Sequence, residues 1–338
     1  MFTITFCYRW FVVNIGIIGT GAYGLALALQ FDKKAKNNVK MWTKFEQEKE
    51  EIVTYRENRK VLPGVRIPKD IEISNDMEYV VKDSDIIVIA VPAAFVGDVS
   101  KEIKNYYNKN QQFVLASKGI ERGTCLFVDD IFKKYVKTKN YCVISGPSFA
   151  VDIVTNCPIG LTIASERKKT IKIVKKALEN DSLKLRESSD VIGVEICGSI
   201  KNVIAIAAGM LDGLGYPEST QAMFITESLN DIKELISKLG GDRDTILTFA
   251  GFGDLLLTAT SKKSRNFSFG ILLGKKLPQS EIDEYVNNTT IEGLYTIKSI
   301  YKLLKHRKVR IPIINLIYDI INNKKKVDEL PKFLISKK

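Results

Sequence analysis

The sequence predicts an α/β protein with an N-terminal doubly wound sheet, followed by an all-helical C-terminal domain. Three observations support this fold class. A run of β-branched residues near the N-terminus leads into a glycine-rich turn and then into a helix rich in Ala and Leu. Further apolar, strand-like segments alternate with helical ones up to about residue 189. From Asp190 onward the strand-like runs disappear, and helical periodicity continues almost to the end of the chain.

The first of these features begins with Val12 to Ile18, whose β-branched residues indicate a strand buried on both faces. It leads into Gly19-Thr-Gly21-Ala-Tyr-Gly24. Gly19 permits a tight turn, Gly21 lets the backbone approach a pyrophosphate, and Gly24 lets the helix pack close to its strand. The N-terminus of that helix offers N–H groups and a partial positive charge to phosphates. The pattern predicts a Rossmann-like dinucleotide-binding domain, with an ordinary glycine-rich turn as the alternative.

We expect four segments along the 338 residues: an N-terminal extension (1–13), a NAD(P)-binding Rossmann domain (14–189), a helical substrate-binding domain (190–325) and a tail (326–338). The extension is apolar, but Arg9 interrupts it and no small-residue cleavage site follows. It therefore reads less as a signal peptide than as a loose extension. No apolar run reaches the roughly 20 residues that a membrane span needs, so we expect no membrane insertion.

Charge and residue counts argue against several classes of function. The net charge is +12, but the lysines are scattered instead of forming a basic stripe with aromatic residues, so we expect no nucleic-acid partner. A positive field does suit small phosphorylated anions. The five cysteines form no CxxC pair and are odd in number, which indicates a reducing, cytoplasmic compartment and no metal site. The single histidine, His306, lies in a basic segment typical of an exposed helix end, so Lys, Asp, Glu or Tyr must carry any proton chemistry.

The choice of cofactor depends on the end of the second predicted strand, Val39 to Trp42. An acidic residue about 20 positions past the glycine-rich loop would bind the ribose 2′-hydroxyl of NAD. Here Thr43 and Lys44 stand in that place, followed by Glu46. A lysine suits a 2′-phosphate, so we expect NADP or NAD as cofactor with NADPH mildly favoured; a simply solvated Lys44 is the alternative.

Two strand ends are expected to face the ligand cleft, because ligands lie beyond the carboxyl ends of the strands in such a sheet. The strand from Phe113 to Ser117 is followed by Lys118, which we expect to face the cleft, a solvent-exposed loop lysine being the alternative. The strand from Tyr141 to Ser145 leads into Gly146-Pro-Ser-Phe-Ala150. This segment can open a helix and present N–H groups and a hydroxyl to an anion.

The helical domain contributes a second set of candidates. Val191 to Met210 is rich in small and apolar residues, which indicates a helix buried on all sides. Lys201 lies in its middle, and a buried lysine is costly unless it is paired or functional. Farther on, Asp254 follows a glycine-rich helix entry. The segment Ser264-Arg265-Asn266 offers a planar guanidinium that matches phosphate oxygens, although an exposed loop of this composition is common.

Together these motifs resemble the prokaryotic-type NAD(P)-dependent glycerol-3-phosphate dehydrogenases, over about Asn14 to Ile321. The resemblance depends on the order and spacing of GTGAYG, PA after IIVIAV, ASKGIE, SGPSFA, IKNVIAIAAGMLDGLG, GFGDLLLT, SRN and IEG. Each motif is ordinary alone, whereas all eight in this order are specific. The family reduces dihydroxyacetone phosphate to sn-glycerol 3-phosphate, the backbone precursor in phospholipid biosynthesis, and the resemblance implies the same reaction here.

The resemblance also implies roles for particular residues. Those implied to bind NAD(P) are Gly19, Gly21, Ala22, Tyr23, Gly24, Lys44, Lys118, Ala150, Arg265, Thr290 and Glu292. Those implied to bind the substrate are Lys118, Gly146, Ser148, Lys201, Asp254, Ser264, Arg265 and Asn266. Lys201 is implied to be the proton donor and acceptor. The first loop position is often serine in the family and is Ala22 here, which removes a hydroxyl contact but keeps the backbone contacts.

Carbonyl reduction is consistent with a catalytic group of Lys201, Lys118 and Asp254. An alkoxide develops on the carbonyl oxygen, and a neighbouring ammonium both stabilises that charge and supplies the proton. Lys118 would favour a neutral Lys201 by repulsion, while Asp254 would oppose this. We therefore predict that Lys201 is the general acid, that Lys118 and Asp254 set its charge and orientation, and that Arg265 with Asn266 holds the phosphate.

Two other functions remain open at this point. A Rossmann-plus-helical reductase that acts on ketopantoate also uses a lysine, but the SGPSFA, GDLLLT and SRN set favours a phosphorylated substrate. A non-catalytic NAD(P) sensor is the second, and the presence of Lys118, Lys201 and Asp254 counts against it. Most such enzymes are symmetric oligomers, so we expect a homodimer.

Overall fold

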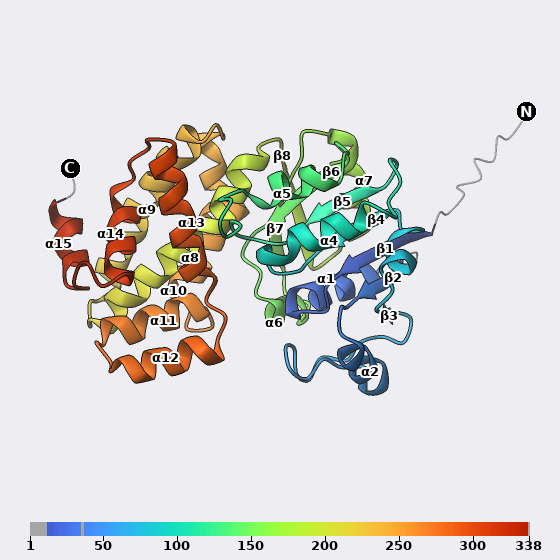
Figure 1. The fold of residues 1–338 in the computed structure, drawn as a ribbon, viewed down its shortest axis with the longest axis horizontal. Coiled ribbons are helices and arrows are strands. Elements are labelled where there is room, and N and C mark those ends of the chain that lie inside the picture. The colour runs from blue at the N-terminus through green and yellow to red at the C-terminus, as the bar shows by residue number, and fades with distance from the viewer. Residues whose placement is uncertain (1–11, 35–36, 337–338) are drawn as a thin grey trace, which may run out of the picture.

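The structure, a computed structural model, describes residues 12–34 and 37–336, so almost all of the expected N-terminal extension lies outside the described residues. In this part of the chain, eight strands form one sheet in the order β3-β2-β1-β4-β5-β6-β7-β8 (Figure 1). The strands are β1 (Val13–Ile18), β2 (Asn37–Trp42), β3 (Glu72–Ser74), β4 (Ile86–Ile89), β5 (Gln112–Leu115), β6 (Tyr141–Ser145), β7 (Ile159–Ala164) and β8 (Leu183–Ser188). The predicted Rossmann-like sheet is confirmed.

Strands β1 to β6 all run parallel to one another. Strand β7 is antiparallel to β6 and parallel to β8. Between β6 and β7 lies only the one-turn helix α6 (Ala150–Ile153), which is too short for the helical crossover that a parallel neighbour needs. Helix α6 begins at Ala150, so the segment that follows β6 does lead into a helix, but Gly146 to Ser148 lie before its first turn. These residues form a loop instead.

Helices cover both faces of the sheet, as in a doubly wound fold. One face packs against α1 (Ala22–Asp32), α2 (Glu46–Tyr55) and α7 (Lys168–Leu178). The other packs against α3 (Met77–Val81), α4 (Val96–Ile103) and α5 (Val128–Tyr135), with the short 3-10 helix η1 (Ala93–Phe95) before α4. The central strands β4, β5 and β6 are buried on both faces and so read as near-continuous apolar runs in the sequence, whereas the edge strand β8 has exposed residues at alternate positions.

The second half of the described chain is helical and surrounds α8 (Val191–Gly213), as Figure 1 shows. Its other elements are α9 (Glu218–Lys238), η2 (Arg243–Leu247), the π-helix η3 (Phe249–Gly253), α10 (Asp254–Thr260), α11 (Arg265–Gly274), α12 (Gln279–Asn288), α13 (Glu292–His306), α14 (Pro312–Ile321) and α15 (Glu329–Ser336). Helices α8 and α11 cross closely: a Cβ at Gly209 would lie 2.0 Å from the carbonyl oxygen of Phe267. This crossing explains the small residues of α8.

Among the described helices, only α8 is long and apolar enough to meet a membrane-span criterion, and 89% of its apolar window is buried inside the protein. Its apolar surface is therefore used for the core of the helical domain. His306 ends α13 and is exposed, as predicted.

The end of the chain differs from the prediction. The expected tail at 326–338 contains α15, whose Leu330 and Leu334 are buried. These two leucines are four residues apart and so share one face of the helix, which packs against α8 and α9. The frayed-tail expectation is therefore wrong for residues 329–336.

Candidate active site

The glycine-rich loop has the shape that a bound pyrophosphate requires. Gly19 has φ +116°, which is strained for other residues, and a Cβ at Gly24 would lie 2.3 Å from the carbonyl oxygen of Gly19. A Cβ at Gly21, by contrast, would meet nothing within 4 Å, so the loop leaves open space on that side. Helix α1 begins at Ala22, and its first-turn N–H groups are available to an anion there. This loop fits the phosphates of NAD(P).

Three charged side chains meet where the two halves of the chain join. Lys118 follows β5, Lys201 lies in the middle of α8, and Asp254 begins α10. The carboxylate of Asp254 accepts hydrogen bonds from Nζ of Lys118 at 2.9 Å and from Nζ of Lys201 at 2.5 Å. Asp254 is 1% exposed, and the hydroxyl of Ser145 also points to it at 3.4 Å. The predicted catalytic residues are therefore in direct contact.

The two ammonium groups experience opposite net effects. Burial lowers the pKa of Lys201 to about 8; the charge of Asp254 opposes the shift, and that of Lys118 adds to it. Burial also acts to lower the pKa of Lys118, but the attraction of Asp254 and Tyr23 outweighs it, and the pKa rises. Burial acts to raise the pKa of Asp254, but the two ammonium groups lower it below its usual range. Burial, more than the predicted repulsion by Lys118, brings the pKa of Lys201 towards neutral pH.

The loop after β6 lies beside this charged group. Nζ of Lys118 donates to the carbonyl oxygen of Gly146 at 3.4 Å, and the hydroxyl of Ser148 donates to the same oxygen at 2.9 Å. The hydroxyl of Tyr23, from α1, is 3.4 Å from that of Ser148. Nζ of Lys118 is also 5.6 Å from the centre of the Tyr23 ring. The structure thus brings the start of α1 and the β6 loop to the same lysine.

A second set of polar side chains connects α8, α11 and α13. The side-chain amide of Asn266 donates to Asn202 at 3.1 Å, and that of Asn202 donates to Glu292 at 2.9 Å. The side-chain oxygen of Asn266 in turn accepts from the backbone N–H of Gly293 at 2.8 Å. The charge of Glu292 favours the protonated form of both Lys118 and Lys201. Asn202 was absent from the predicted site, although its position next to Lys201 in a buried helix was the available signal.

The remaining predicted residues are not among the contacts described so far. Lys44 follows β2, Arg265 begins α11, Thr290 precedes α13, and all three side chains are exposed. Ser264 is buried, and its hydroxyl caps α11 by accepting from the backbone N–H of Phe267 at 3.3 Å. Its side chain therefore already has a structural task.

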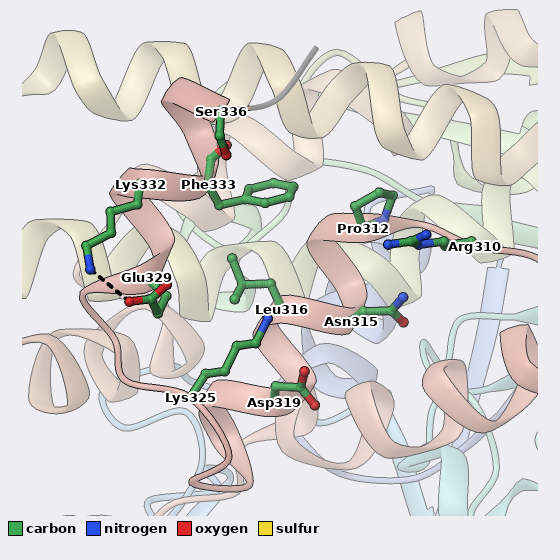
Figure 2. Close-up of a pocket in the computed structure, with 10 residues that line it drawn as sticks. All are labelled: Arg310, Pro312, Asn315, Leu316, Asp319, Lys325, Glu329, Lys332, Phe333 and Ser336. Atoms are coloured by element: carbon green, nitrogen blue, oxygen red, sulfur yellow. Dashed lines mark hydrogen bonds and ion pairs between the residues drawn. The ribbon is translucent and has the colours of Figure 1, made fainter.

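Cavities also lie elsewhere in the described molecule, one of about 410 Å³ between residues 29–33 and 64–68. A cavity of about 370 Å³ lies between α14 and α15, and Figure 2 shows the side chains that line it, among them Arg310, Leu316 and Phe333. Positively and negatively charged side chains line this cavity, and none of the predicted site residues is among them. Within residues 12–34 and 37–336, no group of three His, Cys, Asp or Glu side chains is arranged to hold a metal ion.

Comparison with known proteins agrees with this geometry. A family model described as NAD-dependent glycerol-3-phosphate dehydrogenase N-terminus matches residues 14–171, and one described as NAD-dependent glycerol-3-phosphate dehydrogenase C-terminus matches residues 190–332. A glycerol-3-phosphate dehydrogenase (NAD(P)+) from Fusobacterium nucleatum is 35% identical over 330 residues, which cover 97% of this chain and 98% of that protein.

Two further relatives support the same assignment. A glycerol-3-phosphate dehydrogenase (NAD(P)+) from a Thermoanaerobacter species is 37% identical over 309 residues, covering 91% of this chain and 92% of that protein. The crystal structure of a glycerol-3-phosphate dehydrogenase from Coxiella burnetii superposes with a TM-score of 0.89 at 28% identity, covering 96% of this chain and 99% of that one. This chain therefore belongs to the family of NAD(P)-dependent glycerol-3-phosphate dehydrogenases.

Proposed function

We propose that this chain reduces dihydroxyacetone phosphate to sn-glycerol 3-phosphate with NADH or NADPH, and catalyses the reverse oxidation. The observation that supports this most is the buried contact of Lys118, Asp254 and Lys201 beside a glycine-rich loop that fits a dinucleotide. The bound nicotinamide supplies the hydride. We assign residues 14–189 to the binding of NAD(P) and residues 190–325 to the binding of the substrate.

In this proposal Lys201 is the general acid of the reduction. With a pKa of about 8 it is mostly protonated at pH 7, so it can donate a proton to the developing alkoxide. Asp254 accepts a hydrogen bond from the ammonium group of Lys201 at 2.5 Å, which fixes the orientation of that ammonium group. Lys118 stays charged and adds a fixed positive charge where negative charge develops on the substrate.

The remaining residues bind the ends of the two ligands. We assign the substrate phosphate to Arg265 and Asn266, because a guanidinium and an amide match phosphate oxygens and both residues start the same helix. Gly146 and Ser148 border the reacting end through their contacts with Lys118. The proposed cofactor contacts are those of the glycine-rich loop, Lys44, Lys118, Ala150, Arg265, Thr290 and Glu292.

We further propose that the protein is a cytoplasmic homodimer that supplies phospholipid biosynthesis. Cys125, Cys142, Cys157 and Cys197 are free, which suits a reducing compartment. Light scattering after gel filtration tests the dimer, which should have twice the 38.0 kDa mass of the chain. A mass of one chain at micromolar concentration contradicts it.

The test of the activity is the loss of absorbance at 340 nm with NADH or NADPH and dihydroxyacetone phosphate. Ketopantoate and unphosphorylated dihydroxyacetone are the matched comparison substrates. We expect kcat/KM for the phosphorylated ketone to exceed both by about a hundredfold or more, since a site built for a charged group rejects analogues that leave it unpaired. Cofactor binding without turnover of any of the three substrates contradicts the proposal.

A further inference from the structure

The carboxylate of Glu48 has an unusual set of partners for a residue in an acidic surface helix. It lies in the first turn of α2, shortly after the end of β2. Its Oε2 accepts hydrogen bonds from the hydroxyl of Thr20 at 2.8 Å and from the hydroxyl of Thr43. Its Oε1 accepts from the side-chain amide of Asn58 at 3.1 Å, and the same amide donates to the carbonyl oxygen of Thr20 at 3.2 Å.

These partners are neutral and buried. Thr20, Thr43 and Asn58 are 3%, 2% and 4% exposed. No ion pair within the described part of the chain includes Glu48. The carboxylate is thus held in place by three neutral donors, and no cation within ion-pair distance offsets its charge.

The position of these donors places Glu48 at the adenosine end of the cofactor site. Thr20 lies between the first two glycines of the loop, where the pyrophosphate is expected. Thr43 directly follows β2, where this fold places the adenosine ribose. A carboxylate has about four acceptor positions, and the three protein donors leave one of them, on Oε1, for a further donor.

A ribose 2′-hydroxyl and a 2′-phosphate differ in what they offer at this point. The hydroxyl can donate to the remaining acceptor position of Glu48. The phosphate is negatively charged, so the fixed carboxylate repels it. The exposed ammonium of Lys44 acts in the opposite sense, but it extends into solvent, where its attraction is screened.

We propose that Glu48 is the residue that selects the cofactor of this chain, binding the 2′-hydroxyl of NAD(H) and disfavouring the 2′-phosphate of NADP(H). Judged from Lys44 alone, NADPH is the favoured cofactor; with Glu48 in place, NADH is preferred. The inference rests on the proposed function only in that the chain binds a nicotinamide dinucleotide.

Titration calorimetry with NADH and with NADPH, in the absence of substrate, tests the proposal. We expect wild-type protein to bind NADH about fivefold or more tightly than NADPH. Glu48→Gln keeps the shape, and its amide can donate to the hydroxyls of Thr20 and Thr43 while its oxygen accepts from Asn58. This variant should raise the affinity for NADPH relative to NADH about tenfold, equivalent to about 1.4 kcal/mol.

The matched control is Glu46→Gln, which removes the same charge from the same helical turn. Glu46 shares none of the partners of Glu48: it pairs with Lys49 at 2.6 Å and accepts a hydrogen bond from Asn75. We expect its affinity ratio to stay within about twofold of wild type, since an exposed charge is screened. An equal shift in the two variants would mean that the general field, and not the position of Glu48, sets the preference.

Three other results overturn the proposal: tighter binding of NADPH than NADH by wild-type protein, an unchanged ratio in Glu48→Gln, or a loss of NADPH affinity of about tenfold or more in Lys44→Gln, which would mean that Lys44 is not screened and sets the preference. The wild-type ratio and Lys44→Gln decide the matter even if Glu48→Gln does not fold. Substrate is absent, so selective NADH binding without reduction of dihydroxyacetone phosphate would remove the proposed function and leave this inference intact.

Discussion

Replacing Asp254 by Asn tests the electrostatic account of the site. The substitution keeps the size of the side chain but removes the charge that faces Lys118 and Lys201 at 2.9 and 2.5 Å. At a separation of about 4 Å and an effective dielectric of about 20, one such attraction amounts to about 4 kcal/mol, a factor of about a thousand in the protonation equilibrium. With a wild-type pKa of about 8, Lys201 has protonated and neutral forms in a ratio of about 10:1 at pH 7. In the variant the ratio becomes about 1:100, because the ammonium has lost its counter-charge.

The assay is kcat for the reduction, measured from pH 5.5 to 9.5. Wild-type activity should fall as the pH rises through about 8, because the general acid loses its proton there. In Asp254→Asn we expect kcat at pH 7 to be about a hundredfold lower, with the descending limb moved to lower pH. Asp328→Asn, which removes an exposed acid paired with Lys276, should stay within about twofold of wild type. A descending limb that remains near pH 8 in Asp254→Asn would refute the reasoning.

The same substitution should also change how the stability of the protein depends on pH. Removing the counter-charge leaves the ammonium of Lys118 unpaired and drives Lys201 to its neutral form, which together should cost about 3 kcal/mol or more at pH 7. In the folded variant the pKa values of the two lysines lie below the unfolded value of about 10.4. Between the folded and unfolded pKa values the unfolded state therefore binds more protons, and stability rises with pH. The deficit in Tm relative to wild type should therefore shrink from pH 7 to pH 9.5. A deficit that is constant over this range would indicate a packing defect instead.

Three further predictions concern other parts of the molecule. Arg265→Ala should raise KM for dihydroxyacetone phosphate by about tenfold or more and KM for the cofactor much less, because one charge-assisted phosphate contact is lost; equal effects on both argue against phosphate binding. Gly24→Ala should lower Tm, because the added Cβ would lie 2.3 Å from the carbonyl oxygen of Gly19. Gly21→Ala, whose Cβ would meet nothing within 4 Å, should weaken cofactor binding at nearly unchanged Tm. Equal losses of Tm in the two variants would contradict these different roles of the two glycines. Leu330→Ala in the buried face of α15 should cost about 2–5 kcal/mol in urea unfolding, and a loss below about 0.5 kcal/mol would show that this helix is not part of the core.

The parts of the fold that were predictable have local causes. The β-branched residues of β1 and the glycine spacing up to Gly24 lie within one short segment, so the strand, turn and helix are visible in the sequence. The antiparallel direction of β7 depends on how the chain turns after the one-turn α6, which no local pattern specifies. The burial of α15 depends on α8 and α9, which are more than 90 residues away, and the lysines before it masked its apolar face.

In the candidate site, too, residues with a local sequence signal were predicted, and residues that depend on distant partners were missed. Lys201 stood out because a charged residue inside an apolar helix needs a partner. Lys118 was expected in the cleft because it follows a strand of the sheet, and the family resemblance supplied the role of Asp254. Ser145 was missed because its partner, Asp254, is 109 residues away. Glu48 was missed because it occurs in an acidic run that reads as a solvated helix, while all three of its donors come from outside that helix. Side chains that act through distant partners cannot be found from local patterns alone.

The measurement that tests the central claim most directly is kcat for Lys201→Ala, with and without added methylamine. General acid catalysis contributes about 10²–10⁴-fold, so we expect kcat to fall by that factor with the Kd for NADH nearly unchanged. Methylamine should restore part of the activity, because it can occupy the space of the missing ammonium beside Asp254. Near-normal turnover in Lys201→Ala without added amine would contradict the account.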